Sequence, residues 1–121
     1  YLHGRGLLRF ALGDNKLAIQ DFDKAIAISQ RAASFDPKHA RPFFDRGMTY
    51  LQSGNLERTV ADANRAIELL EGNLNTPVWA KYAPTLKILK AESLELLGDA
   101  YAELGNDADA QAAYQQAADL R

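Results

Sequence analysis

Few side chains in this chain of 121 residues have the types and spacing that catalysis or metal binding needs. The chain has two histidines, His3 and His39, and no cysteine, so it offers no thiolate chemistry and no disulfide framework. No second ligand is spaced to hold a metal ion beside either histidine. The segment 4–6, Gly-Arg-Gly, is similar to part of a phosphate-binding loop, but no strand is expected before it and the rest of that motif is lacking.

Two pairs of aspartates are spaced two residues apart, Asp21 with Asp23 and Asp107 with Asp109. Residues two apart on a helix point to different faces, so neither pair can easily share a proton or a cation. Asp107 and Asp109 fall in a first helical turn, where negative charge complements the helix dipole. We therefore predict no enzyme activity, no cofactor and no metal site.

The feature that repeats along the chain is a pair of glycines seven residues apart: Gly6 and Gly13, Gly47 and Gly54, Gly98 and Gly105. The first glycine of a pair costs roughly 1 kcal/mol within a helix, which is tolerable where another helix must approach closely. The second lies where that helix should end in left-handed backbone. Good N-caps of a second helix follow: Asp14 and Asn15, then Asn55, then Asn106. The unit is helix, tight turn, helix.

Small residues occur in the same register in each second helix: Ala18 and Ala25, Thr59 and Ala66, Ala110 and Ala117. They allow the second helix to nest against the first, while Phe22 or Tyr114 fills the wider gap. Together with Leu97, Gly98 and Tyr101, these residues resemble the tetratricopeptide repeat, W-x2-L-G-x2-Y followed by A-x3-F and A. The resemblance implies an all-α, right-handed superhelical solenoid. Its single domain would hold three repeats with lengthened helices, at about 1–37, 38–74 and 84–121.

The chain departs from the family pattern in its spacing, because equivalent glycines are 41 and then 51 residues apart instead of 34. We expect the first insertion to extend the second helix to about Phe35. The second insertion predicts a loop at 72–84 and a lengthened helix that begins near Pro77 or Pro84. Thr59 and Ala63 make the middle repeat the weakest match. The first repeat begins partway through its motif, so a longer array is expected upstream.

Net charge is −2 and becomes more acidic along the chain: +2 in 1–40, −1 in 41–80 and −3 in 81–121. An acidic end is a poor partner for phosphate backbones, so nucleic acid is disfavoured. No apolar stretch is long enough to cross a membrane. A soluble, cytoplasmic location is favoured, although the lack of cysteine leaves the compartment open.

The resemblance also implies a concave groove, which the first helix of each repeat lines through motif positions 2, 5, 9, 12 and 13. Carried onto this sequence, the chief positions are His3, Leu7 and Phe10, then Arg41, Phe44, Met48, Leu51 and Gln52, then Glu92, Glu95, Asp99 and Glu103. This surface would be apolar in the first two repeats and acidic in the third. It favours a protein or peptide partner with apolar anchors and a basic end. The chaperone-binding subtype uses Lys, Asn and Arg at these positions to clamp a terminal carboxylate. This sequence has His3 and Leu7 in the first repeat and acids in the third instead, so that subtype is not expected.

Two alternatives remain open from the sequence. The apolar part of the groove could be covered by an upstream helix or by the long insertion instead of by a partner. The chain could also be a self-assembly module that stacks end to end into an oligomer or filament through its terminal repeats. The small residues of the last helix, Ala110, Ala112, Ala113, Ala117 and Ala118, would permit such close packing.

Overall fold

The structure is a computed structural model that describes residues 2–30, 39–71 and 81–121. Within these residues the chain forms six α-helices and no strand. In chain order they are α1 (Leu2–Ala11), α2 (Asn15–Gln30), α3 (Ala40–Ser53), α4 (Leu56–Glu71), α5 (Ala83–Glu103) and α6 (Asp107–Leu120). The all-α prediction is confirmed.

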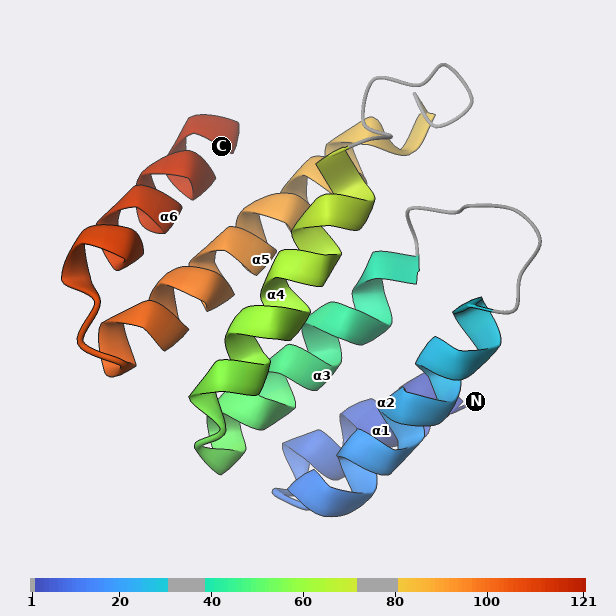
Figure 1. Ribbon diagram of the computed structural model, residues 1–121. Coiled ribbons are helices and arrows are strands. Elements are labelled where there is room, and N and C mark those ends of the chain that lie inside the picture. Colours follow the sequence, from blue (N-terminus) through green and yellow to red (C-terminus); the bar gives the residue numbers. More distant parts are fainter. Residues whose placement is uncertain (1, 31–38, 72–80) are drawn as a thin grey trace.

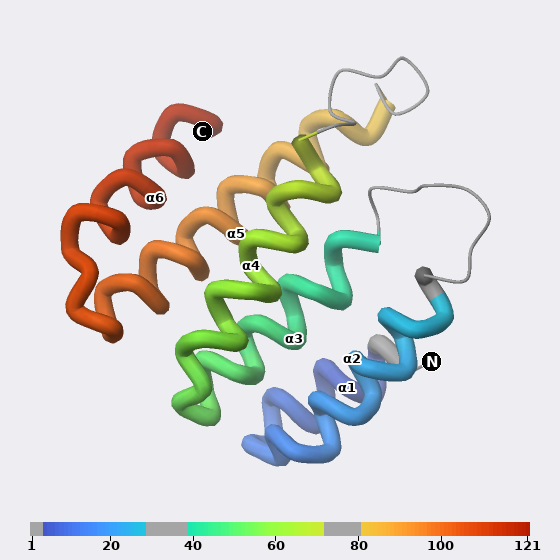
Figure 2. Tube along the Cα trace, in the orientation of Figure 1, coloured from blue at the N-terminus to red at the C-terminus, as the bar shows by residue number. Residues whose placement is uncertain are grey.

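The helices form three antiparallel pairs that stack side by side from α1–α2 to α5–α6, as Figure 1 shows. The tight turns within the three pairs lie along the same side of the stack, so α1, α3 and α5 run in one direction and α2, α4 and α6 run back (Figure 2). Each helix packs against the next, and α1 also contacts α3 while α3 contacts α5. The first helices of the pairs therefore share one face of a helical repeat solenoid.

Each tight turn is built as the glycine pattern predicts. Gly13, Gly54 and Gly105 have positive φ angles of 81°, 86° and 84°, which a side chain would strain. The backbone N–H of Asn55 donates to the carbonyl of Tyr50 at 2.8 Å, which satisfies a carbonyl at the end of α3.

The caps of the second helices differ in one respect from the prediction. The side chains of Asp14 and Asn55 accept hydrogen bonds at 3.3 Å from the backbone N–H of Leu17 and Arg58. Asn106 occupies the N-cap position of α6 but makes no side-chain capping bond, so the expectation for its side chain is wrong.

Close helix approach explains the first glycine of each pair. A Cβ atom on Gly6 would lie 2.8 Å from Cε1 of Phe22, and one on Gly98 would lie 2.6 Å from Cε1 of Tyr114. In the middle pair Ala63 leaves room where the other two have a ring. There the nearest atom to a Cβ on Gly47 would be Cδ2 of Leu96, from the following pair, at 3.0 Å.

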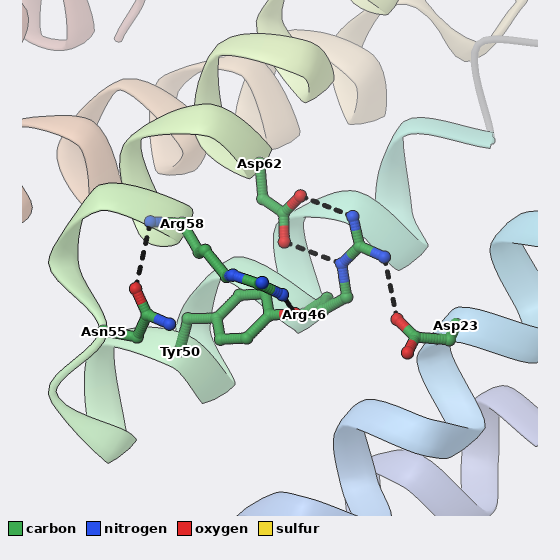
Figure 3. Close-up of polar contacts among 6 residues, drawn as sticks. All are labelled: Asp23, Arg46, Tyr50, Asn55, Arg58 and Asp62. Carbon is green, nitrogen blue, oxygen red and sulfur yellow. Dashed lines mark hydrogen bonds and ion pairs between the residues drawn. The ribbon is translucent and has the colours of Figure 1, made fainter.

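Buried ion pairs bridge the two helices of the first and second repeats. Asp21 accepts from Nε and Nη2 of Arg5 at 3.1 and 2.7 Å. The second repeat has the same pair at the same spacing of sixteen residues. The carboxylate of Asp62 accepts from Nε and Nη2 of Arg46 at 2.8 and 2.7 Å. The remaining nitrogen of Arg46 donates to Asp23 of α2 at 2.8 Å, which ties the first two pairs together (Figure 3).

The third repeat has an apolar pair where the first two have ions. Leu97 and Ala113 occupy the positions of Arg46 and Asp62, and both are buried in the core. The core is continuous from α2 to α6, with Ile26, Phe44, Ile67, Leu70, Leu89 and Leu94 among its members.

The boundaries of the second insertion differ from the prediction at one end. Pro84 lies in the first turn of α5, which begins at Ala83, and its missing N–H is harmless there because no N–H of that turn has an intrahelical partner. Residues 83 and 84 therefore belong to α5 and not to the expected loop at 72–84. The predicted extension to Phe35 and the alternative start at Pro77 lie outside the described residues.

Candidate functional site

An open hollow of about 590 Å³ lies between the first helices of the three pairs. Its apolar lining comes from all three of them and consists of Phe10, Phe44, Met48, Leu51 and Leu96. Its polar lining comes mainly from α5 and consists of Gln52, Glu92, Glu95, Asp99, Glu103 and Arg121. We call this hollow the groove, its apolar residues the floor and its four carboxylates the acidic wall.

Nine of the twelve groove positions carried over from the repeat pattern line this hollow: Phe10, Phe44, Met48, Leu51, Gln52, Glu92, Glu95, Asp99 and Glu103. Arg41 lies instead beside a neighbouring hollow at the start of α3. Leu7 is half-buried and is not among the described residues that line the groove. The side chain of His3 lies outside the described part of the chain.

The floor follows from helical spacing on α3. Phe44, Met48 and Leu51 are spaced four and three residues apart, so they lie on one face of α3. Phe44 is only 4% exposed and belongs to the core, so it anchors the floor to the core and offers little surface to a partner. Met48 and Leu51 are half-buried and present the accessible apolar surface.

Gln52, the polar residue that α3 adds to the groove, links neighbouring helices through its side chain. Its Nε2 donates to the side-chain oxygen of Asn15 at 2.6 Å and to the carbonyl of Phe10 at 3.3 Å. These bonds tie the end of α3 to the α1–α2 turn, and they hold Phe10, the part of the floor that α1 supplies, beside α3.

The acidic wall also follows from helical spacing. Glu92, Glu95, Asp99 and Glu103 are three, four and four residues apart, so they lie along one face of α5 over about 16 Å at 1.5 Å per residue. The guanidinium of Arg121 forms an ion pair with Glu95. Among the described residues no ion pair engages Glu92 or Glu103. The wall therefore keeps an excess of negative charge.

Asp99 is held by a residue of α6, the second helix of its pair. The hydroxyl of Tyr114 donates to Oδ1 of Asp99 at 2.5 Å, and this bond raises the pKa of Tyr114 to about 12. The bond fixes the carboxylate on the groove side of α5, next to the ring that packs on Gly98.

Sequence reasoning missed two lining residues, Leu96 and Arg121. Leu96 follows Glu95 directly and lies one turn after Glu92, so helical spacing could have indicated it. Arg121 follows α6, which is the second helix of its pair, and the repeat pattern assigns no groove position there.

A second polar cluster lies away from the groove and joins α2, α3 and α4 (Figure 3). Arg58 donates to the hydroxyl of Tyr50 at 3.2 Å and lies over its ring at 5.6 Å. Arg46 is bound by Asp62 and Asp23, and these hydrogen bonds raise its pKa. Because two arginines meet two aspartates, the cluster has no excess charge for a ligand, and its contacts hold repeats together.

The described residues contain no group of three or more His, Asp or Glu side chains that could hold a metal ion. His39 precedes α3 and makes no capping bond with its side chain.

Among the described residues no helix combines the length and apolar character needed to cross a membrane. Cover of the floor by residues 72–80 falls outside the described part of the chain.

Comparison with known families agrees with the helical pairs. A family model described as tetratricopeptide repeat matches residues 1–39 and 91–121, which together make up more than half of the chain. The unmatched middle contains Thr59 and Ala63, where the repeat pattern is weakest. No curated protein matches the sequence significantly. Repeats of this kind generally mediate protein–protein interaction and are typically non-enzymatic scaffolds. With three stacked helical pairs and these two matches, the chain belongs to the tetratricopeptide repeat family.

Proposed function

We propose that this chain is a scaffold that holds a segment of a partner protein in the groove. The segment, either an extended peptide or a helix, places apolar side chains on the floor and Lys or Arg side chains against the acidic wall. The observation that carries this proposal is the joint placement of an apolar floor and four carboxylates around one open hollow.

The floor supplies the affinity in this proposal. Met48 and Leu51 offer apolar surface that a partner side chain would remove from water, at roughly 25 cal/mol per Å². Met48 is unbranched and can adapt to anchors of different shape. Phe44 keeps the floor in place because it is packed in the core.

The wall supplies the specificity. Glu92 and Glu103 lie at the two ends of the wall, and neither forms an ion pair with a described residue. The charge of Glu92 already helps to raise the pKa of Arg121, so Glu103 is the carboxylate that a cation on the partner would neutralise most fully. Such charge complementarity mainly raises the association rate and rejects acidic partners. A terminal carboxylate would be repelled here, so we propose that an internal, basic segment is bound.

A random-peptide library displayed on phage tests this proposal with the intact chain as bait. Enriched peptides should combine Leu, Ile, Phe or Met with Lys or Arg. Their affinity should fall by about tenfold, or 1.4 kcal/mol, with Met48→Gln or Glu103→Lys. Glu68→Lys is the matched control, because Glu68 is exposed on α4 and makes only a surface ion pair with Arg65. Enrichment of acidic peptides, or equal affinity of all variants, would contradict the proposal.

A second candidate function, self-association at the end of the stack, is supported by the outer face of α1. Leu8 and Leu12 are 60% and 75% exposed. The residues equivalent to Leu8 in the next two repeats, Thr49 and Ala100, are fully buried. We propose that a second copy of the chain covers Leu8 and Leu12 at high concentration. Leu8→Asp should then lower the mass found by light scattering, and a monomeric wild type would exclude this function.

The opposite end of the stack gives self-association less support. On α4, Val60, Ile67 and Leu70 are half-buried or buried. In the register of the glycines, α6 and the residue after it have Gln111, Ala118 and Arg121 at these three positions, and all three are exposed. At these positions the end formed by α6 therefore lacks the large apolar side chains that α4 uses to pack against the next pair, and head-to-tail stacking through both terminal repeats would require them.

A further inference from the structure

The first helix of the third pair is longer than its counterpart in the second pair. α5 has 21 residues and α3 has 14. In the register of the glycines, the start of α3 at Ala40 corresponds to Ala91, so residues 83–90 are an extension that the regular repeat lacks. Leu86 and Leu89 of this extension are buried in the core, while Ile88 is 53% exposed.

The extension forms a second hollow of about 390 Å³ against the start of α3. Its lining consists of Arg41, Thr85, Leu86, Ile88, Leu89 and Glu92. Three of these six are large aliphatic side chains, so the second hollow suits an apolar group. Glu92 belongs to the lining of both hollows, and it marks the point where the second hollow meets the groove.

One face of α5 runs past both hollows. Ile88, Glu92, Glu95, Asp99 and Glu103 follow one another at intervals of four, three, four and four residues, which keeps them on one side of the helix. Along this face the side chains change from apolar at Ile88 to acidic from Glu92 onward. Ile88 and Asp99 are eleven residues apart, or about 16 Å along the helix axis.

The charge at the junction is negative. Arg41 is engaged within α3, since its Nε lies 3.4 Å from Oδ1 of Asp45 and its guanidinium lies 5.5 Å from the ring centre of Phe44. Glu92 forms no ion pair with a described residue, and Arg121, whose pKa the charge of Glu92 helps to raise, is paired with Glu95. A partner that runs from one hollow to the other would therefore pass a carboxylate that has no direct ionic partner.

We propose that the groove and the second hollow together bind one segment with two apolar anchors and a Lys or Arg between them. The first anchor rests on Met48 and Leu51, the second rests on Ile88, and the cation faces Glu92. This inference rests on the proposed function and adds the second anchor, its site and its spacing. In the register of the glycines Met48 corresponds to Asp99, which lies eleven residues after Ile88 on α5. Along the helix axis the two anchor sites are therefore about 16 Å apart, a separation that roughly five residues of extended chain or eleven residues of α-helix would span.

Fluorescence anisotropy with a designed peptide series tests the spacing. Each fluorescein-labelled peptide carries two Phe anchors separated by roughly three to twelve Ser and Lys residues, a range that covers both conformations. A peptide with one Phe anchor is the reference. The best two-anchor peptide should bind about tenfold more tightly than the reference, because the second anchor binds at a high effective concentration. An optimum near five residues indicates an extended segment, and one near eleven indicates a helix.

Substitutions at Ile88 assign the second anchor. Ile88→Ala and Ile88→Asp should abolish the tenfold gain and leave binding of the one-anchor peptide unchanged. Both should fold normally, since Ile88 is more than half exposed, and circular dichroism checks this. Lys87→Ala is the control: it makes the same change in net charge as Ile88→Asp on an exposed neighbour and should keep the full gain.

The possible failures are distinct. Affinity that depends on Met48 but not on anchor spacing or on Ile88 would overturn the two-anchor inference and leave the proposed function standing. If no peptide of the series binds, or if binding is indifferent to Met48→Gln, both the inference and the proposed function are wrong.

Discussion

The ring of Tyr114 occupies the space that any side chain at position 98 would need, with Cε1 only 2.6 Å from where a Cβ of Gly98 would lie. Phe22 has the same relation to Gly6, at 2.8 Å. The glycine and the ring therefore set the spacing of the helices within the first and third pairs. In the third pair the same tyrosine also binds Asp99, so packing between α5 and α6 and the geometry of the acidic wall depend on one side chain.

Gly98→Ala should destabilise the protein because the new methyl group must displace the Tyr114 ring. Overpacking of this kind costs about 1–3 kcal/mol, and the higher helix propensity of Ala offsets about 1 kcal/mol of it. Urea denaturation measures the change in the free energy of unfolding. Gly4→Ala is the control, since nothing lies within 4 Å of a Cβ there and stability should rise. A Gly98→Ala variant that is more stable than wild type by about 1 kcal/mol, the gain that helix propensity alone would give, would show that the ring moves freely.

Arg46→Leu should lower the free energy of unfolding by about 3–5 kcal/mol, because it leaves the buried Asp62 carboxylate without its partner. Arg46→Leu combined with Asp62→Ala copies the apolar pair Leu97 and Ala113 of the third repeat. The double variant should regain most of the loss in thermal or urea unfolding. If it is as unstable as the single variant, the ion pair has a role that apolar packing cannot replace.

Acid should weaken the first repeat through Asp21. The hydrogen bonds from Arg5 lower the pKa of Asp21 below its unfolded value of about 4. This carboxylate therefore stabilises the fold at pH values above the unfolded pKa, and the stabilisation is lost as the pH falls through the folded pKa. From about pH 5 to about pH 2, wild type should lose more stability to urea than Asp21→Asn does. Equal losses would contradict this assignment.

The hydroxyl of Tyr114 should ionise at a higher pH than that of an ordinary tyrosine. Its hydrogen bond to Asp99 raises its pKa to about 12, so removing the acceptor charge with Asp99→Asn should bring the pKa down toward the usual value of 10.0. An ultraviolet titration at 295 nm, with Tyr114→Phe subtracted to isolate this ring, measures the change. A titration of Tyr114 that Asp99→Asn does not alter would mean that the bond is absent in solution.

Much of the fold could be predicted because a few positions have strict requirements. Gly54 needs left-handed backbone, Gly98 needs a missing side chain, and Ala66 needs to be small, so their register alone indicates helical pairs. Nine of the residues that this register assigns to the groove line the hollow between α1, α3 and α5.

The remainder depends on packing between residues that no local pattern relates. Arg121 reaches Glu95 only because α6 runs back along α5, and the start of α5 at Ala83 depends on where the insertion ends. The second hollow arises from contact between the α5 extension and Arg41, which the family spacing does not contain. Asp21 and Asp62 were not predicted as buried ion partners, because their arginines lie sixteen residues away on another helix.

Amide chemical shifts of the ¹⁵N-labelled chain, recorded while a peptide enriched from the phage library is added, test the account most directly. We predict that the shifts concentrate on the groove face of α3 and α5, at Met48, Leu51, Glu95 and Asp99, and leave Glu68 on α4 unchanged. Shifts that concentrate on α2, α4 and α6, with Met48 and Asp99 unaffected, would show that the partner binds elsewhere and that the groove is not the binding site.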